Sequence, residues 1–164
     1  MLDPADLAQW FEAHAPPLVL YARQWLDRSA SEDAVQEVFV RLMLQRQPPQ
    51  NVRAWLYRAV RNEAISRGRS ERRRDQRERR RAGSERWFDV EPAESLDAAA
   101  AEVALKDLPP GQRETIVLRV WGGMTLAEVA AVTGSPVSTV FDQYQAGLRA
   151  VRQKMGVPCK TKEN

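Results

Sequence analysis

Apolar residues recur along this chain every three or four positions, which is the spacing of an α-helix, and no segment alternates as a half-buried strand would. Near the start, one apolar series runs from Leu7 to Phe11, and a second begins at Leu18, after Pro16 and Pro17. Proline lacks a backbone donor and usually ends or kinks a helix. The pattern therefore predicts an all-α fold that opens with two short helices on either side of the proline pair.

Two longer helices are predicted to follow. The first covers residues 30–45, because Ser29 and Glu32 have the spacing of a capping box, in which the two side chains satisfy free amides at a helix start. The second is capped by Asn51. It carries an apolar face made of Val52, Trp55, Leu56, Ala59 and Val60. Glu63 falls on that same face, which requires either a buried ion pair or a different register.

Start and stop signals divide the last third of the chain into helices. Pro109 and Pro110 open one helix, which ends at the pair Gly122 and Gly123. A short helix and a final helix follow, and their signals are a capping box of Thr125 and Glu128, a stop at Gly134, and a new start at Ser135 and Pro136. The predicted order is helix, short helix, tight turn, helix.

Three residues in this region have the spacing of a helix-turn-helix motif. Ala130 is small enough for two helices to approach, Gly134 permits a left-handed turn, and Val140 fills the shared core. The last helix of such a motif enters the DNA major groove. An ordinary antiparallel helix pair would satisfy the same spacing.

Charge is segregated along the 164 residues, although the net charge is only +3. Residues 53–86 hold 13 basic and 5 acidic residues, and every basic one is arginine. The segments before and after this block are both net acidic. Guanidinium groups suit phosphate contacts, so the block predicts a polyanionic partner, unless it is only a solvated helix or a disordered tract.

The remaining composition indicates a cytoplasmic protein without a catalytic or metal site. No run approaches the ~18 apolar residues of a membrane span, and the acidic start is unlike a secretory signal. Cys159 is the single cysteine and His14 the single histidine, and neither lies in a cluster with metal-ligand spacing. We therefore expect no enzymatic activity, no cofactor and no membrane insertion.

Three segments together resemble the extracytoplasmic-function subgroup of bacterial sigma factors. They are SEDAVQEVFVRL, NVRAWLYRAVRNEAISRGR and LPPGQRETIVLRVWGGMTLAEVAAVTGSPVSTV. The resemblance spans about residues 7–155 and implies a factor that binds core RNA polymerase, recognises two promoter elements and assists DNA melting. It implies a polymerase-binding and melting domain (1–82), a flexible linker (83–98), a helix-turn-helix domain (99–156) and a tail (157–164).

The resemblance also implies partners and contact residues in the first domain. The partners are promoter DNA, the clamp helices and flap of core polymerase and, in some cases, an anti-sigma factor. The clamp contacts would be Asp33, Gln36, Glu37 and Arg41. The loop 47–51 would capture a flipped base of the promoter element nearer the start site. The residues at that element would be Asn51, Arg53, Arg58, Arg61 and Asn62.

The second domain departs from the family in its recognition helix. The residues expected at the upstream element are Thr125, Ser138, Thr139, Asp142, Gln143, Gln145 and Arg149. Members of the family usually carry several basic residues near the start of this helix, whereas residues 141–146 here include one acid and no base. We therefore expect weak autonomous binding by this domain, with most DNA affinity supplied by residues 53–86.

Two other functions fit parts of the sequence. A helix-turn-helix regulator could bind operator DNA without polymerase, in which case residues 30–45 would be only structural. A basic RNA-binding protein could use the arginine block, but such proteins usually interleave aromatic residues with the charge, and there are none between Tyr57 and Trp87.

Overall fold

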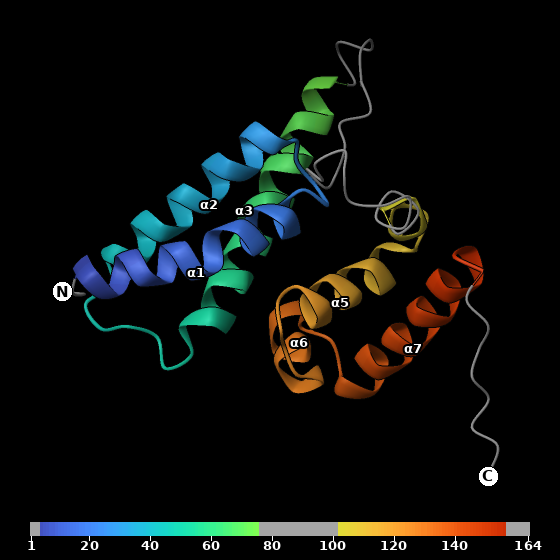
Figure 1. Cartoon of the computed structure of the whole chain (residues 1–164). Helices are drawn as coiled ribbons and strands as arrows, with labels where there is room; N and C mark the ends of the chain where they lie inside the picture. Colours follow the sequence, from blue (N-terminus) through green and yellow to red (C-terminus); the bar gives the residue numbers. More distant parts are fainter. Residues whose placement is uncertain (1–3, 76–101, 157–164) are drawn as a thin grey trace, which may run out of the picture. The chain divides into compact units, whose positions relative to one another are not determined.

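The computed structural model of the chain describes residues 4–75 and 102–156, and within these ranges every regular element is an α-helix (Figure 1). The predicted all-α fold is confirmed. The helices group into two compact units, one containing α1 to α3 and the other built around α5 and α7. The predicted linker 83–98 and tail 157–164 lie outside the described residues, so the domain boundaries stay predictions.

The first unit consists of α1 (Pro4–Ala22), α2 (Arg28–Met43) and α3 (Val52–Asp75), and each of these helices packs against the other two. The largest fully buried side chains include Leu18, Tyr21, Val35, Val38, Leu42, Leu56, Tyr57 and Val60. The Tyr21 ring meets Tyr57 edge to face, with centroids 5.3 Å apart. Of the predicted apolar face of α3, Leu56 and Val60 are in the core, whereas Val52, Trp55 and Ala59 are only half-buried.

The predicted break at Pro16 and Pro17 is wrong, because α1 continues through both prolines. A proline inside a helix costs about 3 kcal/mol or more. Ala15, Leu18 and Ala22 lie on either side of the pair and are all buried in the unit. Burial of one continuous apolar face, which a break would have interrupted, offsets the cost of the two missing donors.

The predicted capping box at Ser29 and Glu32 is also wrong. α2 begins earlier, at Arg28, and its N-cap is Asp27, whose carboxylate accepts a hydrogen bond of 2.8 Å from the Ala30 amide. Glu32 instead pairs with Arg28, one turn before it, at 3.0 Å. The aspartate provides a cap by itself, so the serine lies within the helix.

The start of α3 is as predicted. The Asn51 side chain accepts a hydrogen bond of 2.9 Å from the Ala54 amide. The helix continues to Asp75, well into the arginine-rich segment. A row of arginines is thereby carried on one rigid element.

The second unit contains α5 (Pro110–Val120), α6 (Leu126–Thr133) and α7 (Val137–Lys154), preceded by a short helical stretch at residues 102–106. α5 packs against α7. Pro110 opens α5, a capping box of Thr125 and Glu128 opens α6, and Gly134 ends it with a φ of +70°. These predicted signals are confirmed.

The helix-turn-helix core is formed as the spacing predicted. Ala130 and Val140 are buried, and Gly134 turns the chain between α6 and α7 in the left-handed conformation. Gly147, on α7, allows the close approach of α5, because a Cβ there would lie 2.7 Å from Cδ1 of Ile116. α7 is thereby held by one side and exposes the other.

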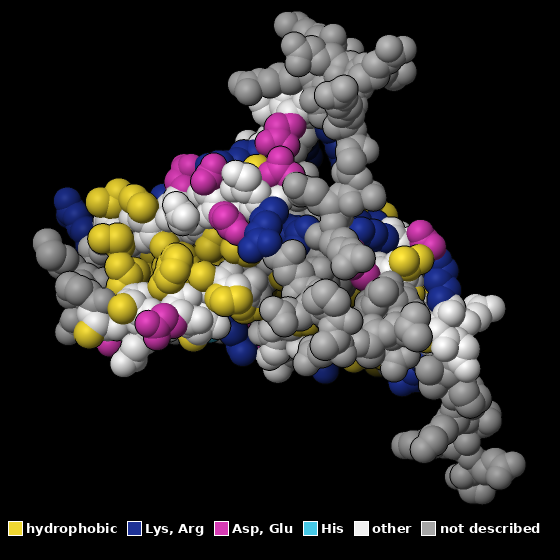
Figure 2. All heavy atoms as spheres, turned by 45° about the horizontal axis from the view of Figure 1, so that its top comes forward, with side chains coloured by type: hydrophobic (Ala, Val, Ile, Leu, Met, Phe, Trp, Pro, Cys, Tyr) yellow, Lys and Arg dark blue, Asp and Glu magenta, His cyan; other side chains and the backbone are white. Residues whose placement is uncertain are grey.

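An apolar groove remains open on the first unit, between the first half of α1 and the second half of α2. Apolar side chains gather over this part of the surface (Figure 2). Phe11 and Phe39 meet edge to face at its floor, with centroids 5.0 Å apart, and Val40 and Met43 are exposed beside them.

Candidate functional site

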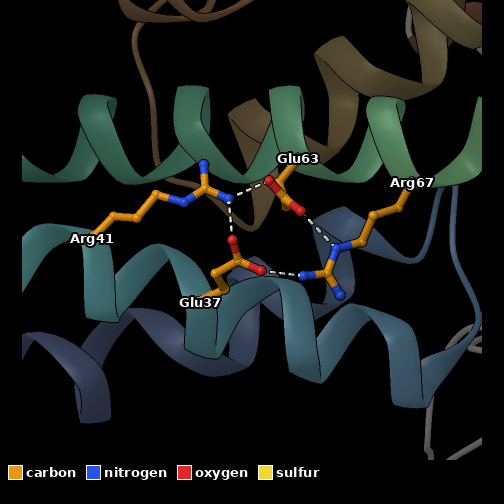
Figure 3. Close-up of polar contacts among 4 residues, drawn as sticks. All are labelled: Glu37, Arg41, Glu63 and Arg67. Atoms are coloured by element: carbon orange, nitrogen blue, oxygen red, sulfur yellow. Dashed lines mark hydrogen bonds and ion pairs between the residues drawn. The ribbon is translucent and has the colours of Figure 1, made fainter.

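Four charged side chains join α2 to α3 in a closed ring (Figure 3). On α2, Arg41 donates to Glu37 at 2.8 Å, and on α3, Arg67 donates to Glu63 at 2.7 Å. Two further ion pairs cross between the helices, from Arg41 to Glu63 and from Arg67 to Glu37. We call these residues the inter-helix charge ring.

The charge ring explains why Glu63 lies on the apolar side of its helix. Its side chain is only 17% exposed. Partial burial by itself raises the pKa of Glu63, but hydrogen bonds donated by Arg67 and Arg41 outweigh it and hold the pKa below its ordinary value. Of the two readings of Glu63 left open above, the ion pair is confirmed.

The four residues expected to bind a polymerase all lie on the outer side of α2, but they do not share one environment. Asp33 and Gln36 are exposed, and Gln36 also lines the apolar groove. Glu37 and Arg41 instead belong to the charge ring. Sequence reasoning missed Arg67, whose only signal was its spacing of four residues from Glu63.

The residues expected at the promoter element nearer the start site divide between the beginning and the middle of α3. The Asn51 side-chain oxygen caps the helix, and Arg58 is exposed. Arg61 and Asn62 line one hollowed face together with Arg69 and Arg73, about two and three turns further along. The arginine face is therefore longer than the sequence motif indicated.

Arg53 lies near two titratable side chains of the core. Burial and the charge of Arg53 lower the pKa of His14. Burial raises the pKa of Tyr57 to about 12, and Arg53 opposes this only in part. In both side chains burial favours the uncharged form.

In the second unit, Thr125 serves as a helix cap. Its hydroxyl accepts from the Glu128 amide at 3.2 Å, and the Glu128 carboxylate accepts from the Thr125 amide at 2.8 Å. Five of the other expected DNA contacts are exposed on α7: Ser138, Thr139, Asp142, Gln145 and Arg149.

Gln143 does not share that exposed face. Its side-chain oxygen accepts a hydrogen bond of 3.3 Å from the Thr115 hydroxyl on α5, and its amide lies against Gly111. Because α5 packs on this side of α7, the structure gives Gln143 a role in joining the two helices. Its neighbours Asp142 and Gln145 point elsewhere on the helix.

Arg119 is a further polar anchor that the sequence did not single out. It donates to the carbonyl of Met124, in the turn between α5 and α6. Its guanidinium also lies over the Tyr144 ring of α7, 5.4 Å from the centroid. One side chain thus ties the turn to the recognition helix.

Within residues 4–75 and 102–156, no group of histidine, cysteine and acidic side chains has a geometry that could hold a metal ion. Among the described helices, none is both long and apolar enough to cross a membrane.

Comparison with protein families gives two matches in order along the chain. Residues 10–74 match sigma-70 region 2, and residues 98–151 match sigma-70 region 4. Together they cover more than two thirds of the sequence. The first match coincides with α1 to α3, and the second contains α5 and α6 and most of α7.

Relatives and solved structures agree with these matches over nearly the whole length. The chain is 27% identical over 170 residues to the ECF RNA polymerase sigma factor SigK of Mycobacterium tuberculosis, covering 94% of this chain and 88% of the relative. The sigma factor RpoE of Bartonella quintana, solved with the anti-sigma factor NepR, has a TM-score of 0.77 at 24% identity, with 93% of this chain and 98% of that chain covered. CnrH, solved with the cytosolic domain of CnrY, has a TM-score of 0.65 at 24% identity, with 94% and 90% covered. At this identity the two structures establish a shared fold.

Proposed function

Because the chain belongs to the extracytoplasmic-function group of the sigma-70 family of RNA polymerase sigma factors, we propose a division of its work among three helix faces. The outer side of α2 binds core polymerase. The arginine face of α3 contacts promoter DNA where the strands separate. The exposed side of α7 contacts the upstream element.

The observation that carries this assignment is the pairing of each family match with its own compact unit. A helix-turn-helix regulator that acts without polymerase would need only the second unit, and it is not favoured, because region 2 accounts for the first. An RNA-binding protein that relies on the arginine block would need neither match.

The charge ring has a positioning role in this proposal. It holds Glu37 and Arg41 in one geometry on the outer side of α2, so that less side-chain entropy is lost when polymerase binds. Asp33 and Gln36, which lie outside the ring, make direct contacts.

The loop 47–51, which precedes α3, captures a base that has left the stack. On α3, Arg61, Asn62 and the arginines beyond them contact the strand's phosphates. Unstacking a base costs a few kcal/mol, so melting requires this binding energy. Polymerase supplies the catalysis, and the factor itself performs no covalent chemistry. It acts in the cytoplasm, where polymerase and promoters are.

An anti-sigma factor is a further partner that we propose for this chain. Of the two solved proteins with this fold, RpoE was solved with the anti-sigma factor NepR, and CnrH was solved with the cytosolic domain of CnrY. The open apolar groove between α1 and α2 is a surface of the right character for a bound helix.

The polymerase contact is tested by charge reversal at Asp33. Asp33→Lys removes an exposed carboxylate without touching the charge ring, so the fold stays intact. We expect affinity for core polymerase to fall roughly tenfold or more, as for loss of a desolvated interfacial charge pair. Fluorescence anisotropy of labelled factor against core polymerase measures it, with circular dichroism as the check on folding.

Asp6→Lys is the matched control, because it makes the same charge change at an exposed position on α1. It should bind core polymerase nearly as the wild type does. A folded Asp33→Lys protein with unchanged affinity would show that this face of α2 is not the contact.

A further inference from the structure

The first turns of α7 expose an apolar pair where DNA-reading residues are expected. Val137 and Phe141 are each 48% exposed, although valine and phenylalanine are usually buried in folded proteins. They are four positions apart, so they lie on one ridge of the helix. Among the described residues of α7, these two are the large apolar side chains that are exposed.

The ridge flanks the side that holds α7 in place, because Val137 is three positions before buried Val140 while both ridge residues are exposed. Val140 and Gly147 are buried, and Gln143 is bonded to Thr115 of α5. Phe141 is adjacent to exposed Asp142 and four residues before exposed Gln145. The apolar pair therefore belongs to the side that a helix-turn-helix presents to base edges, which it contacts with its N-terminal residues.

Only one base offers an apolar group in the major groove, and that is thymine through its C5-methyl. We propose that Val137 and Phe141 read thymine methyl groups in the upstream promoter element, and that Phe141 is the main determinant of specificity there. This inference rests on the proposed role of α7 as the upstream-element helix. It gives the element a chemical character, namely thymine at one or two adjacent positions.

The neighbouring charges support the same choice. Guanine is most often read by arginine or lysine, and residues 137–148 contain neither. Asp142, next to Phe141, would face the two acceptors of guanine unfavourably, and it can accept from the amino groups of cytosine or adenine. The start of α7 thus disfavours guanine and offers thymine an apolar contact.

The test uses holoenzyme, made of the full chain and core polymerase, and promoter duplexes recovered from a library randomised over the upstream element. Selected duplexes should be enriched in thymine at one or two adjacent positions. Replacing those thymines with deoxyuridine removes only the methyl groups. Because burial of one methyl-sized group corresponds to about a fourfold change in affinity, we expect about fourfold weaker binding per position.

Phe141→Ala should bind the thymine and deoxyuridine duplexes equally, and Phe141→Leu should keep part of the difference. Gln145→Ala, on the same face, should keep all of it. A difference that survives Phe141→Ala, or selection without any thymine preference, would overturn the inference and leave the proposed function standing.

Two other results would separate failure of this inference from failure of the proposed function. If Phe141→Ala weakens binding to core polymerase in the absence of DNA and leaves the deoxyuridine effect unchanged, the ridge contacts protein and the inference is overturned. If wild-type holoenzyme selects no sequence at all, the proposed function itself fails, and this readout does not depend on Phe141.

Discussion

Glu63 lies on the inner side of α3, where a carboxylate without a partner would be costly. It has two arginine partners. Arg67 lies one turn away on the same helix, and Arg41 lies on α2. The charge ring therefore fixes the register of α2 against α3 as well as satisfying the buried group. Polar groups that must be paired in this way contribute to the specificity of a fold.

Removing the charge of Glu63 should destabilise the first unit in a way that depends on pH. For Glu63→Gln we expect the free energy of unfolding at pH 7 to fall by about 1.5 to 3 kcal/mol, the range for hydrogen bonds to charged groups. The pKa of Glu63 is lower in the folded state than in the unfolded chain, so its contribution is complete above the unfolded pKa and is lost as the pH falls through the folded pKa. Urea unfolding at pH 7 and pH 4 measures the free energy of unfolding of the wild type and of Glu63→Gln.

The difference in free energy of unfolding between the wild type and Glu63→Gln should be smaller at pH 4 than at pH 7. Glu37→Gln is the matched control, since Glu37 is 49% exposed and belongs to the same charge ring. Its effect should be smaller at both pH values. A difference for Glu63 that grows as the pH falls would contradict this account.

At the scale of single elements, the end of α6 gives a prediction that depends on the backbone alone. Gly134 has a φ of +70°, and nothing lies within 4 Å of the position that a Cβ would occupy. Gly134→Ala should therefore cost about 1 to 2 kcal/mol, the strain of the left-handed conformation, without any clash. Thermal unfolding followed by circular dichroism measures the loss.

Gly134→Asn separates strain from other effects, because asparagine tolerates the left-handed region better than alanine does. It should be more stable than the alanine variant. Equal stabilities for the two variants, or an alanine variant as stable as the wild type, would show that the turn is not limited by this φ.

The elements also show which features a sequence can predict. The start of α5 and both ends of α6 were predictable, because Pro110, Thr125 and Gly134 act through their own backbone and near neighbours. The course of α1 was not, because burial against α2 and α3 outweighs the local effect of two prolines. The two ion pairs of the charge ring that cross between α2 and α3, and the Gln143–Thr115 bond, join residues at least 22 positions apart, so no local pattern indicates them.

For the whole molecule, the uneven distribution of charge assigns most of the DNA affinity to α3. The segment 53–86 holds 13 arginines, and eight of them lie on α3, which ends at Asp75. α7 has its basic residues only toward its far end, at Arg149, Arg152 and Lys154. Lys154 is moreover paired with Asp107.

Two triple variants that remove equal charge test this assignment. Replacing Arg61, Arg69 and Arg73 with glutamine should flatten the dependence of log affinity on log salt by roughly two to three units, since each phosphate contact contributes about 0.7 to 0.9. The same change at Arg149, Arg152 and Lys154 should flatten it by less than about one unit. The measurement is promoter binding by holoenzyme across a salt series, and a larger effect of the second triple would contradict the prediction.

The two prolines inside α1 also bear on how the protein is made. Pro16 and Pro17 cannot donate to the carbonyls one turn before them, so α1 has little helical stability of its own. It emerges from the ribosome before α2 and α3, against which it packs, and these are complete only at Asp75. At about 5 to 20 residues per second, the nascent chain waits for seconds before that support exists. We therefore expect α1 to remain unfolded during translation and to become a helix only when the other two helices have been synthesised.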